Sequence, residues 1–225
     1  MRLYGSANSP FSTRVSIATR AKGLDLAQAP LPEGGLRSAQ FLALNPAGKI
    51  PVLDTGSFTL PESTVILRYL EDRHPTPSLF PGDAEGRARM NAIAALVDTY
   101  VMEPVIRLFP HLNESTRDAR VVASEVARWE QGMALLDRWL RDPLPPVQAA
   151  ASFVDCVLPP ALHLSRRISL MLGLARDPAD GQPAVVAYRT RMQAHPLVGP
   201  ALATLTSAQE TYDLKAGRPS LASLY

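Results

Sequence analysis

The sequence predicts an α/β domain over residues 1–80, followed by an all-helical domain over residues 84–225. Two observations carry this prediction. Short apolar runs that suit strands alternate with helical patterns before residue 80, and from Asp83 onward only helical periodicity remains. The chain has 225 residues, of which 46% are hydrophobic and 20% charged, a composition typical of globular proteins.

Charge and cysteine content exclude several classes of function. The 23 Lys and Arg residues are balanced by 21 Asp and Glu residues and are spread along the chain, which argues against a nucleic-acid partner. The single cysteine, Cys156, rules out an internal disulfide, a Cys-x-x-Cys redox centre and a thiolate zinc cluster. No apolar run has membrane-spanning length. We therefore expect a cytoplasmic protein without a membrane or nucleic-acid partner.

The first strand and helix are predicted between Leu3 and Gly23. Leu3 and Tyr4 form a short apolar run that ends in a glycine. Ser9-Pro10 then supplies a capping hydroxyl and a first-turn proline, which has no N–H to lose there. Apolar residues recur at positions 11, 15 and 18, and Gly23 ends the helix.

The rest of the first domain continues this alternation. A proline near the start of the third strand confines that strand's first residue to a position outside the hydrogen-bonded ladder or to a special bond geometry. Thr55-Gly56-Ser57 is typical of a hairpin turn. The predicted elements are a strand within residues 24–31, a helix over 39–44, strands over 50–54 and 58–60, and a helix over 62–73.

The second domain is predicted to be helical throughout. Residues 84–108 are expected to form one long helix that Pro104 kinks. Ser152 and Asp155 form a capping box, with Asp in the usual place of Glu, which begins a later helix. The other predicted helices cover residues 116–140, 152–172, 183–194 and 196–208, and a polar tail follows.

The segment Ser9-Pro10-Phe11-Ser12 joins the first strand to the first helix, where unpaired N–H groups and the helix dipole favour an anion. A thiolate placed there would accept a hydrogen bond from the Ser9 hydroxyl, and the helix field would lower the pKa of the thiol. In the alternative interpretation, Ser9 is only the helix cap. Both roles can hold at once.

Three motifs resemble, in order and spacing, those of the cytosolic glutathione transferases. They are SPFS at residues 9–12, NPAGKIPVL at residues 45–53 and PESTVILRYL at residues 61–70. The second and third together are highly specific, and the resemblance covers nearly the whole chain. It implies a thioredoxin-like N-terminal domain with the element order βαβαββα, an all-helical C-terminal domain, and glutathione as co-substrate.

The resemblance also implies how the motifs hold glutathione. In the family the proline matching Pro51 is cis, which leaves the main chain of Ile50 free to pair with the cysteinyl backbone. Lys49 would pair with the glycyl carboxylate, Ser63 with the γ-glutamyl carboxylate and Glu62 with the γ-glutamyl ammonium. The alternatives are an edge-strand proline, a solvated lysine and an ordinary first helical turn.

The serine-type zeta and theta classes are the most similar, since in them the first serine of the segment contacts the sulfur. Ser9 is therefore the expected catalytic residue, and Phe11 is expected beside the bound glutathione. Cysteine-type classes have a cysteine at this position, so thiol-disulfide exchange by the protein itself is not expected. The zeta class has Ser-Ser-Cys where this chain has Ser9, Pro10 and Phe11, which weakens the case for maleylacetoacetate isomerase activity.

A second substrate would meet the sulfur in a cleft between the two domains. Arg107 is expected to hold an acidic substrate or a developing negative charge. For Tyr100 and Phe109, a plain core position is an equal alternative. The candidates are Ala7, Asn8 and Phe11 in the first loop, and Tyr100, Pro104, Arg107 and Phe109 around the predicted kink.

Cys156 and the four histidines are expected to have structural roles only. Cys156 follows the capping box and is expected to be a buried, inert thiol. His74, His111, His163 and His195 lack metal-ligand spacing and are expected at the surface. The sequence therefore predicts no metal site.

The sequence thus predicts a bacterial glutathione transferase-like enzyme with a role in detoxification, expected to be a homodimer. It would ionise the glutathione thiol for attack on a small electrophile. One alternative is a glutathione-dependent isomerase or lyase of an acidic metabolite, for which Arg107 is the only indication. The other is a non-catalytic interaction protein that keeps the fold, against which the intact Lys49, Pro51, Glu62 and Ser63 argue.

Overall fold

A small sheet organises the first part of this computed structural model, which describes residues 1–215. β1 pairs in parallel with β2 and antiparallel with β3, and β3 pairs antiparallel with β4. The strands are β1 (Arg2–Tyr4), β2 (Ala27–Ala29), β3 (Val52–Asp54) and β4 (Thr59–Pro61), in the sheet order β2-β1-β3-β4. β3 is shorter than predicted, because it begins only after the cis Ile50–Pro51 bond and a proline cannot donate to the ladder.

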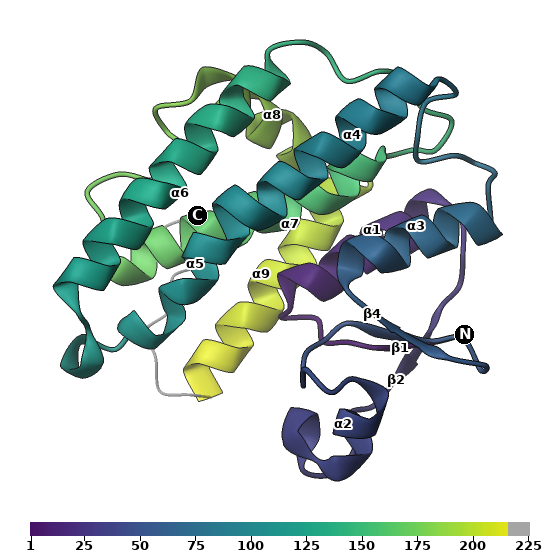
Figure 1. Cartoon of the computed structure of the whole chain (residues 1–225), viewed down its shortest axis with the longest axis horizontal. Coiled ribbons are helices and arrows are strands. Elements are labelled where there is room, and N and C mark those ends of the chain that lie inside the picture. The colour runs from purple at the N-terminus through teal and green to yellow at the C-terminus, as the bar shows by residue number, and fades with distance from the viewer. Residues whose placement is uncertain (216–225) are drawn as a thin grey trace.

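Helices cover both sides of this sheet. α1 (Pro10–Ala21) and α3 (Ser63–Arg73) pack against each other on one side, while α2 (Ala39–Leu44) lies away from them (Figure 1). With the four strands, these helices confirm the predicted βαβαββα order. Strand β2 covers only the middle of the predicted residues 24–31.

The rest of the described chain is helical, as predicted. Figure 1 shows α7 passing through the middle of this part, with the other helices around it. The helices are α4 (Ala84–Leu96), a π-helical segment (Val97–Met102), α5 (Glu103–Arg107), α6 (Ala119–Leu140), α7 (Phe153–Leu172), α8 (Pro183–Gln193) and α9 (Val198–Lys215). α9 extends beyond the predicted end at residue 208, and residues 216–225 of the predicted polar tail lie outside the described residues.

The predicted single helix over residues 84–108 is wrong in one respect, since its regular α-helical pattern is broken at Val97–Met102. Pro104 has no N–H to donate to the Tyr100 carbonyl. That carbonyl faces α6, where a Cβ at Gly132 would lie only 2.0 Å from its oxygen. The missing side chain of Gly132 therefore allows the irregular segment to pack closely against α6.

A buried ion pair ties α1, α3 and the following linker together. The Lys22 ammonium donates to the Glu71 carboxylate at 2.6 Å and to the Pro77 carbonyl at 2.8 Å. Glu71 also accepts from the Leu79 N–H at 3.1 Å and from the Ser78 hydroxyl. One continuous apolar core then extends from β1 to α9.

The capping box at the start of α7 is confirmed. The Ser152 hydroxyl accepts from the Asp155 N–H, and the Asp155 carboxylate accepts from the Ser152 N–H at 2.9 Å. The other carboxylate oxygen accepts from the Tyr188 hydroxyl at 2.6 Å. Cys156 is fully buried, and this burial raises the pKa of its thiol well above the usual value. A protonated, inaccessible thiol agrees with the structural role expected of it.

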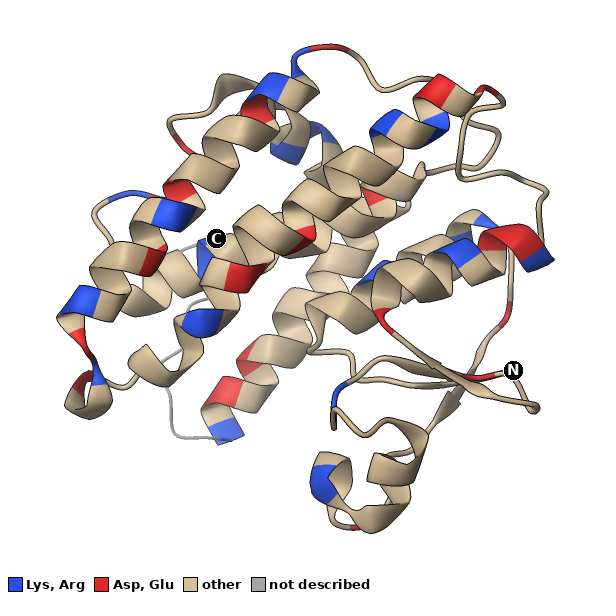
Figure 2. Ribbon diagram, viewed as in Figure 1, with Lys and Arg blue, Asp and Glu red and all other residues tan. Residues whose placement is uncertain are grey.

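Figure 2 shows acidic and basic residues interspersed along the helices. No helix within residues 1–215 is both long and apolar enough to cross a membrane.

Candidate functional site

The three motifs meet at one edge of the sheet. The strand register pairs Tyr4 with Val52 and Val52 with Pro61, so these residues lie side by side. The loop to α1 follows Tyr4, the cis-proline turn precedes Val52, and Glu62 follows Pro61. β1 and β4 run in the same direction because each is antiparallel to β3. Both α1 and α3 therefore begin at this edge.

Ser9 is the N-cap of α1. Its Oγ accepts a hydrogen bond from the Ser12 N–H at 3.2 Å, and its carbonyl accepts from the Thr13 N–H at 3.0 Å. A hydroxyl that accepts in this way still has its own hydrogen to donate. Ser9 is half-buried, whereas Ser12 is buried and its Oγ accepts from the Ser6 N–H at 3.2 Å. The capping role is thus present, and it leaves the Ser9 O–H available for a second partner.

The cis-proline turn is held by a buried asparagine. The Asn45 amide donates to the Lys49 carbonyl at 2.8 Å, and its oxygen accepts from the Ala47 N–H at 3.1 Å. Lys49 itself is exposed. Ile50 precedes β3 and stands outside the ladder register, which begins at Val52. The turn thus combines a fixed main chain with an exposed ammonium group.

The N-terminus of α3 combines backbone strain with a buried hydroxyl. Glu62 is exposed and has φ 67°, a left-handed value that is uncommon for a residue with a side chain. Ser63, the first residue of the helix, is buried. The unpaired N–H groups of this first turn and the helix dipole suit a carboxylate.

The fully buried guanidinium of Arg14, a residue not among the predicted site residues, lies behind this helix start. Its Nη1 donates to the Ser63 hydroxyl at 3.3 Å and to Asp98 of the helical part at 2.7 Å. The Phe11 ring lies 4.9 Å from its Cζ. Burial lowers the pKa of Arg14 and Asp98 opposes this, and an arginine stays charged in any case. Its position on the apolar face of α1, four residues before Ala18, was a usable signal.

The predicted second-substrate residues of the helical part differ in exposure and in charge environment. Tyr100 is 48% exposed, whereas Pro104 is buried and can act only through the shape of the helix. Arg107 is exposed and pairs with Glu103 at 3.0 Å, and it lies 4.0 Å from Glu125. Arg128 pairs with the same two carboxylates, at 3.2 Å from Glu103 and 2.8 Å from Glu125, so Arg107 belongs to a charge-balanced cluster rather than standing alone to hold an acidic substrate.

The first loop has a partner that no local pattern predicts. Asn8 is half-buried, and its carbonyl accepts from the Gln209 side-chain amide of α9 at 3.2 Å. Ala7, beside it, is exposed. Phe109, the last of the predicted set, is 45% exposed and lies beyond α5. Helix α9 thus borders the loop that carries Ser9.

The expectation that His163 lies at the surface is wrong. It is partly buried in α7, its Nε2 lies 3.0 Å from the Gln209 Oε1, and burial lowers its pKa to about 4. The cause is the packing of α9 over α7, which the histidine's own segment does not reveal. Within residues 1–215, no cluster of three or more His, Cys, Asp or Glu side chains is arranged to hold a metal ion.

Comparison with known proteins identifies the family. The family model of the glutathione S-transferase N-terminal domain matches residues 3–78. A maleylacetoacetate isomerase from Pseudomonas aeruginosa is 34% identical over 210 residues, which cover 87% of this chain and 96% of that protein. The chain belongs to the cytosolic glutathione transferase family. A maleylpyruvate isomerase from a Ralstonia species is 44% identical to this transferase-family chain over 100 residues, 43% of this chain and 47% of that protein.

Solved structures of glutathione transferases share the fold. One from Methylobacterium radiotolerans, in complex with glutathione sulfonate, has a TM-score of 0.72 at 24% identity and covers 89% of this chain and 93% of its own. A bacterial maleyl pyruvate isomerase of the zeta class has a TM-score of 0.64 at 25% identity, and the match covers 89% of this chain and 96% of that protein. The predicted thioredoxin-like domain followed by a helical part is confirmed, and so is the prediction of a glutathione transferase-like enzyme.

Proposed function

We propose that this transferase binds glutathione at the sheet edge described above and that Ser9 holds the glutathione sulfur as a thiolate for attack on a small electrophile. The observation that carries the proposal is the convergence of the Ser9 cap, the cis Pro51 turn and the Ser63 helix start at this edge. Two helix N-termini there favour negative charge. Glutathione brings two carboxylates and, once ionised, a thiolate.

The geometry suggests a role for each group. The main chain of Ile50 would pair with the cysteinyl backbone, and the exposed Lys49 would reach the glycyl carboxylate. Arg14 occupies the acceptor side of the Ser63 hydroxyl, so the hydroxyl hydrogen is directed elsewhere, and the γ-glutamyl carboxylate would receive it. Glu62 would bind the γ-glutamyl ammonium.

Activation of the thiol would follow from the cap geometry. The Ser9 Oγ accepts from the Ser12 N–H, so its own O–H would donate to the sulfur. This donation and the α1 dipole both stabilise the thiolate over the thiol and lower the thiol pKa. Ser12 suits the role less well, because it is buried whereas Ser9 is half-buried. Phe11, packed against Arg14, would border the bound peptide.

Isomerisation of an acidic alkene is the second candidate reaction. It is favoured by the 34% identity to a maleylacetoacetate isomerase, despite Phe11 at the position of the zeta cysteine. The thiolate would add to the conjugated double bond, the resulting enolate would rotate about the new single bond, and expulsion of the thiolate would restore the double bond. The pairing of Arg107 with Glu103 means that this side chain must first leave its partner to bind the substrate.

The decisive experiment compares the wild-type enzyme with Ser9→Ala and with Ser57→Ala, an exposed control in the β3–β4 turn. We expect Ser9→Ala to keep the glutathione Kd in calorimetry and to lower turnover of 1-chloro-2,4-dinitrobenzene and of maleylpyruvate by about 10²-fold. The control should match the wild type. Unchanged turnover would leave Ser9 as a cap only, and absence of glutathione binding at millimolar concentration would favour an interaction protein.

We also propose that the chain is a cytoplasmic homodimer with a role in detoxification. Support comes from its membership of the glutathione transferase family. Light scattering during size-exclusion chromatography gives the mass directly. A mass near twice 24.4 kDa is expected, and a mass near 24.4 kDa would contradict the proposal.

A further inference from the structure

The buried face of α9 carries two polar residues in line with apolar ones. Apolar side chains at positions 198, 201 and 205 are followed on this face by Gln209 and Asp213, at the helical spacing of three and four residues. A buried polar side chain costs stability unless it is hydrogen-bonded, so each of the two needs a specific partner. Asp213 forms an ion pair with Arg167 of α7. The partners of Gln209 lie in two different parts of the molecule.

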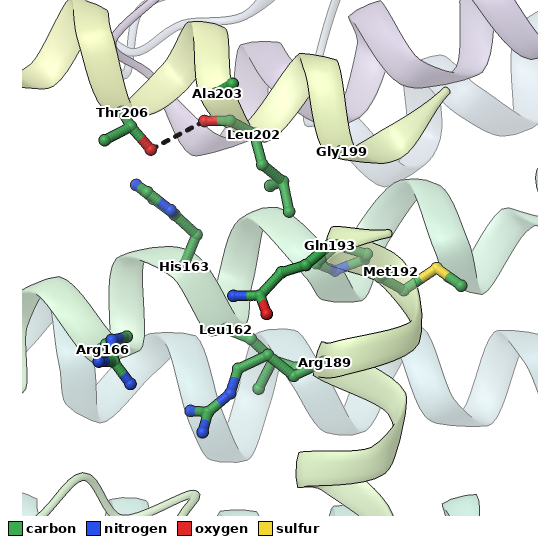
Figure 3. A pocket seen from close by; sticks show the side chains of 11 residues that line it. Leu162, His163, Arg166, Arg189, Met192, Gln193, Gly199, Leu202, Ala203 and Thr206 are labelled. Carbon is green, nitrogen blue, oxygen red and sulfur yellow. Dashed lines mark hydrogen bonds between the residues drawn. The ribbon is translucent and has the colours of Figure 1, made fainter. Parts of the chain in front are cut away.

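Gln209 is 6% exposed and connects α7 to the first loop of the sheet domain. Its Nε2 donates to the Asn8 carbonyl at 3.2 Å, and its Oε1 lies 3.0 Å from the His163 Nε2. Figure 3 shows the His163 ring pointing from α7 toward α9, beside Leu202 and Thr206, which line the same pocket. A carbonyl only accepts, so the amide nitrogen of Gln209 faces Asn8 and its oxygen accepts from His163. His163 thus fixes which way the Gln209 amide is turned.

The bond from Gln209 holds one end of the peptide group that joins Asn8 to Ser9. The N–H at the other end of this group belongs to Ser9 and donates to the Ser6 carbonyl at 3.0 Å. A peptide group is planar, so holding its C=O and its N–H fixes the orientation of its plane. The Ser6 hydroxyl also donates to the Asn8 side chain at 2.5 Å. The chain that leads into Ser9 is therefore held by α9 on one side and by its own turn on the other.

Helix α1, which packs beside α9 (Figure 1), holds the other side of Ser9. The Ser9 carbonyl accepts from the Thr13 N–H and from the Thr13 hydroxyl, both at 3.0 Å. The Ser9 Oγ accepts from the Ser12 N–H at 3.2 Å. These bonds require the extended backbone of an N-cap, which Ser9 has with φ −94° and ψ 118°. Without Gln209, the preceding peptide group would be held by Ser6 alone, and Ser9 would leave this conformation more often.

We propose that Gln209 is a positioning residue for Ser9: by holding the Asn8–Ser9 peptide group, it keeps the Ser9 hydroxyl directed at the glutathione sulfur. This inference rests on the proposed role of Ser9 as the donor to that sulfur. Gln209 acts through the loop and does not itself contact glutathione. The Ser9 hydroxyl must accept from Ser12 while it donates to sulfur, and a misplacement of about 1 Å can lower a rate by about 10²-fold.

Amide hydrogen exchange tests the positioning step without glutathione. Gln209→Met removes both bonds of the amide, and Gln131→Met makes the same change at an exposed position of α6 as a control. We expect Gln209→Met to speed exchange of the Ser9 N–H by at least about fivefold, the factor for one lost hydrogen bond, and to leave the Ile17 N–H within α1 unchanged. The control should match the wild type at both positions.

A second variant covers the case in which Gln209→Met does not fold. Gln209→Glu keeps the acceptor for His163 and, once ionised, cannot donate to the Asn8 carbonyl. The same faster exchange of the Ser9 N–H is expected from it. Its negative charge would itself disfavour a nearby thiolate, so exchange is the measurement that applies to this variant.

The pKa of the bound glutathione thiol, read from the ultraviolet absorbance of the thiolate, tests the effect on Ser9. Gln209→Met should raise this pKa by about 0.5 or more and lower turnover of 1-chloro-2,4-dinitrobenzene about tenfold, with a glutathione Kd within about twofold of the wild type. In a Ser9→Ala background the same change should have no further effect, because no hydroxyl remains to be positioned. A merely structural role would lower turnover by the same factor in both backgrounds.

The two measurements separate this inference from the function on which it rests. Wild-type exchange of the Ser9 N–H in a folded Gln209 variant would overturn the positioning role, whatever Ser9 does. An unshifted thiol pKa in Gln209→Met, where Ser9→Ala shifts it, or equal losses in the two backgrounds, would also overturn it. If Ser9→Ala leaves the thiol pKa unchanged, the proposed role of Ser9 fails, whereas faster exchange in Gln209→Met would still show that Gln209 holds the loop.

Discussion

Arg14 of α1 donates to Asp98 of the π-helical segment at 2.7 Å, and this ion pair joins the sheet domain to the helical part beside Ser63. The Arg14 side chain is fully buried, whereas that of Asp98 is 35% exposed. Within residues 1–215, the Nε and Nη2 of Arg14 have no hydrogen-bond partner. A buried cation thus pairs directly with the Asp98 carboxylate, behind the helix start that we propose for the γ-glutamyl group.

Replacement of Asp98 by Asn should therefore be costly. Removing one partner leaves the Arg14 charge buried without compensation, and we expect a loss of about 2–3 kcal/mol in the free energy of unfolding, measured with urea. The double change Arg14→Met with Asp98→Asn should recover part of this loss. A single Asp98→Asn effect below about 0.5 kcal/mol would show that the pair is only a surface contact.

The two roles of Ser9 can be separated by substitution. Ser9→Ala removes the cap and the donor, so both stability, by about 1 kcal/mol, and thiolate formation should fall. Ser9→Asp keeps the cap acceptor without a hydroxyl donor, so stability should hold while the pKa of bound glutathione rises. Ser9→Thr should keep both. Thermal unfolding and the ultraviolet absorbance of the thiolate report the two effects, and an unshifted thiol pKa in Ser9→Asp would exclude the donor role.

Because the backbone at Glu62 is left-handed, substitutions can separate the effect of its backbone strain on stability from the effect of its carboxylate on glutathione binding. Glycine reaches φ 67° without the penalty of a side chain, so Glu62→Gly should be more stable than Glu62→Ala by about 1 kcal/mol. Both variants should bind glutathione more weakly, because both lose the carboxylate. Denaturant unfolding and calorimetry measure the two quantities, and equal stability of the two variants would contradict the strain.

The capping box gives a prediction about stability alone. Asp155→Ala leaves the Ser152 N–H and the Tyr188 hydroxyl without their acceptor, and we expect a loss of about 3 kcal/mol or more. Tyr188→Phe removes one bond only and should cost about 1–2 kcal/mol. Both are measured by urea unfolding. A smaller loss for Asp155→Ala than for Tyr188→Phe would contradict the shared role of this carboxylate.

His163 should make stability depend on pH in a definite direction. Its folded pKa is lowered to about 4 by burial, and the charges of Arg167 and Arg166 contribute. Between the unfolded pKa near 6.5 and the folded pKa, the unfolded chain binds the extra proton, so stability falls as pH falls through this window. The whole shift corresponds to about 3 kcal/mol. The free energy of unfolding of the wild type, relative to that of His163→Gln, should fall by about this amount from pH 7 to pH 4. A difference that stays constant with pH would exclude the lowered pKa of His163.

Much of the fold could be predicted because its signals act within a few residues. The Ser9 cap and the Ser152–Asp155 capping box are hydrogen bonds within one helical turn, and both were predicted and are present. The cis geometry at Pro51 followed from the family resemblance, and the element order of the first domain followed from the alternation of apolar runs and helical patterns. One local signal was overlooked, since Glu103 and Arg107 are four residues apart on one helix and pair there.

The sequence by itself thus determined the element order, most of the helix starts and the motifs that meet at the sheet edge, although α6 begins at Ala119 rather than at the predicted residue 116. Only the tertiary structure showed that Arg14 pairs with Asp98 and that the Tyr100 carbonyl packs against Gly132. It also showed that Gln209 donates to the Asn8 carbonyl, 201 residues away in the sequence. Local propensity arises from bonds between near neighbours in the chain, whereas these contacts arise only when whole helices pack. Packing therefore decides which charges are neutralised and which groups remain to bind a ligand.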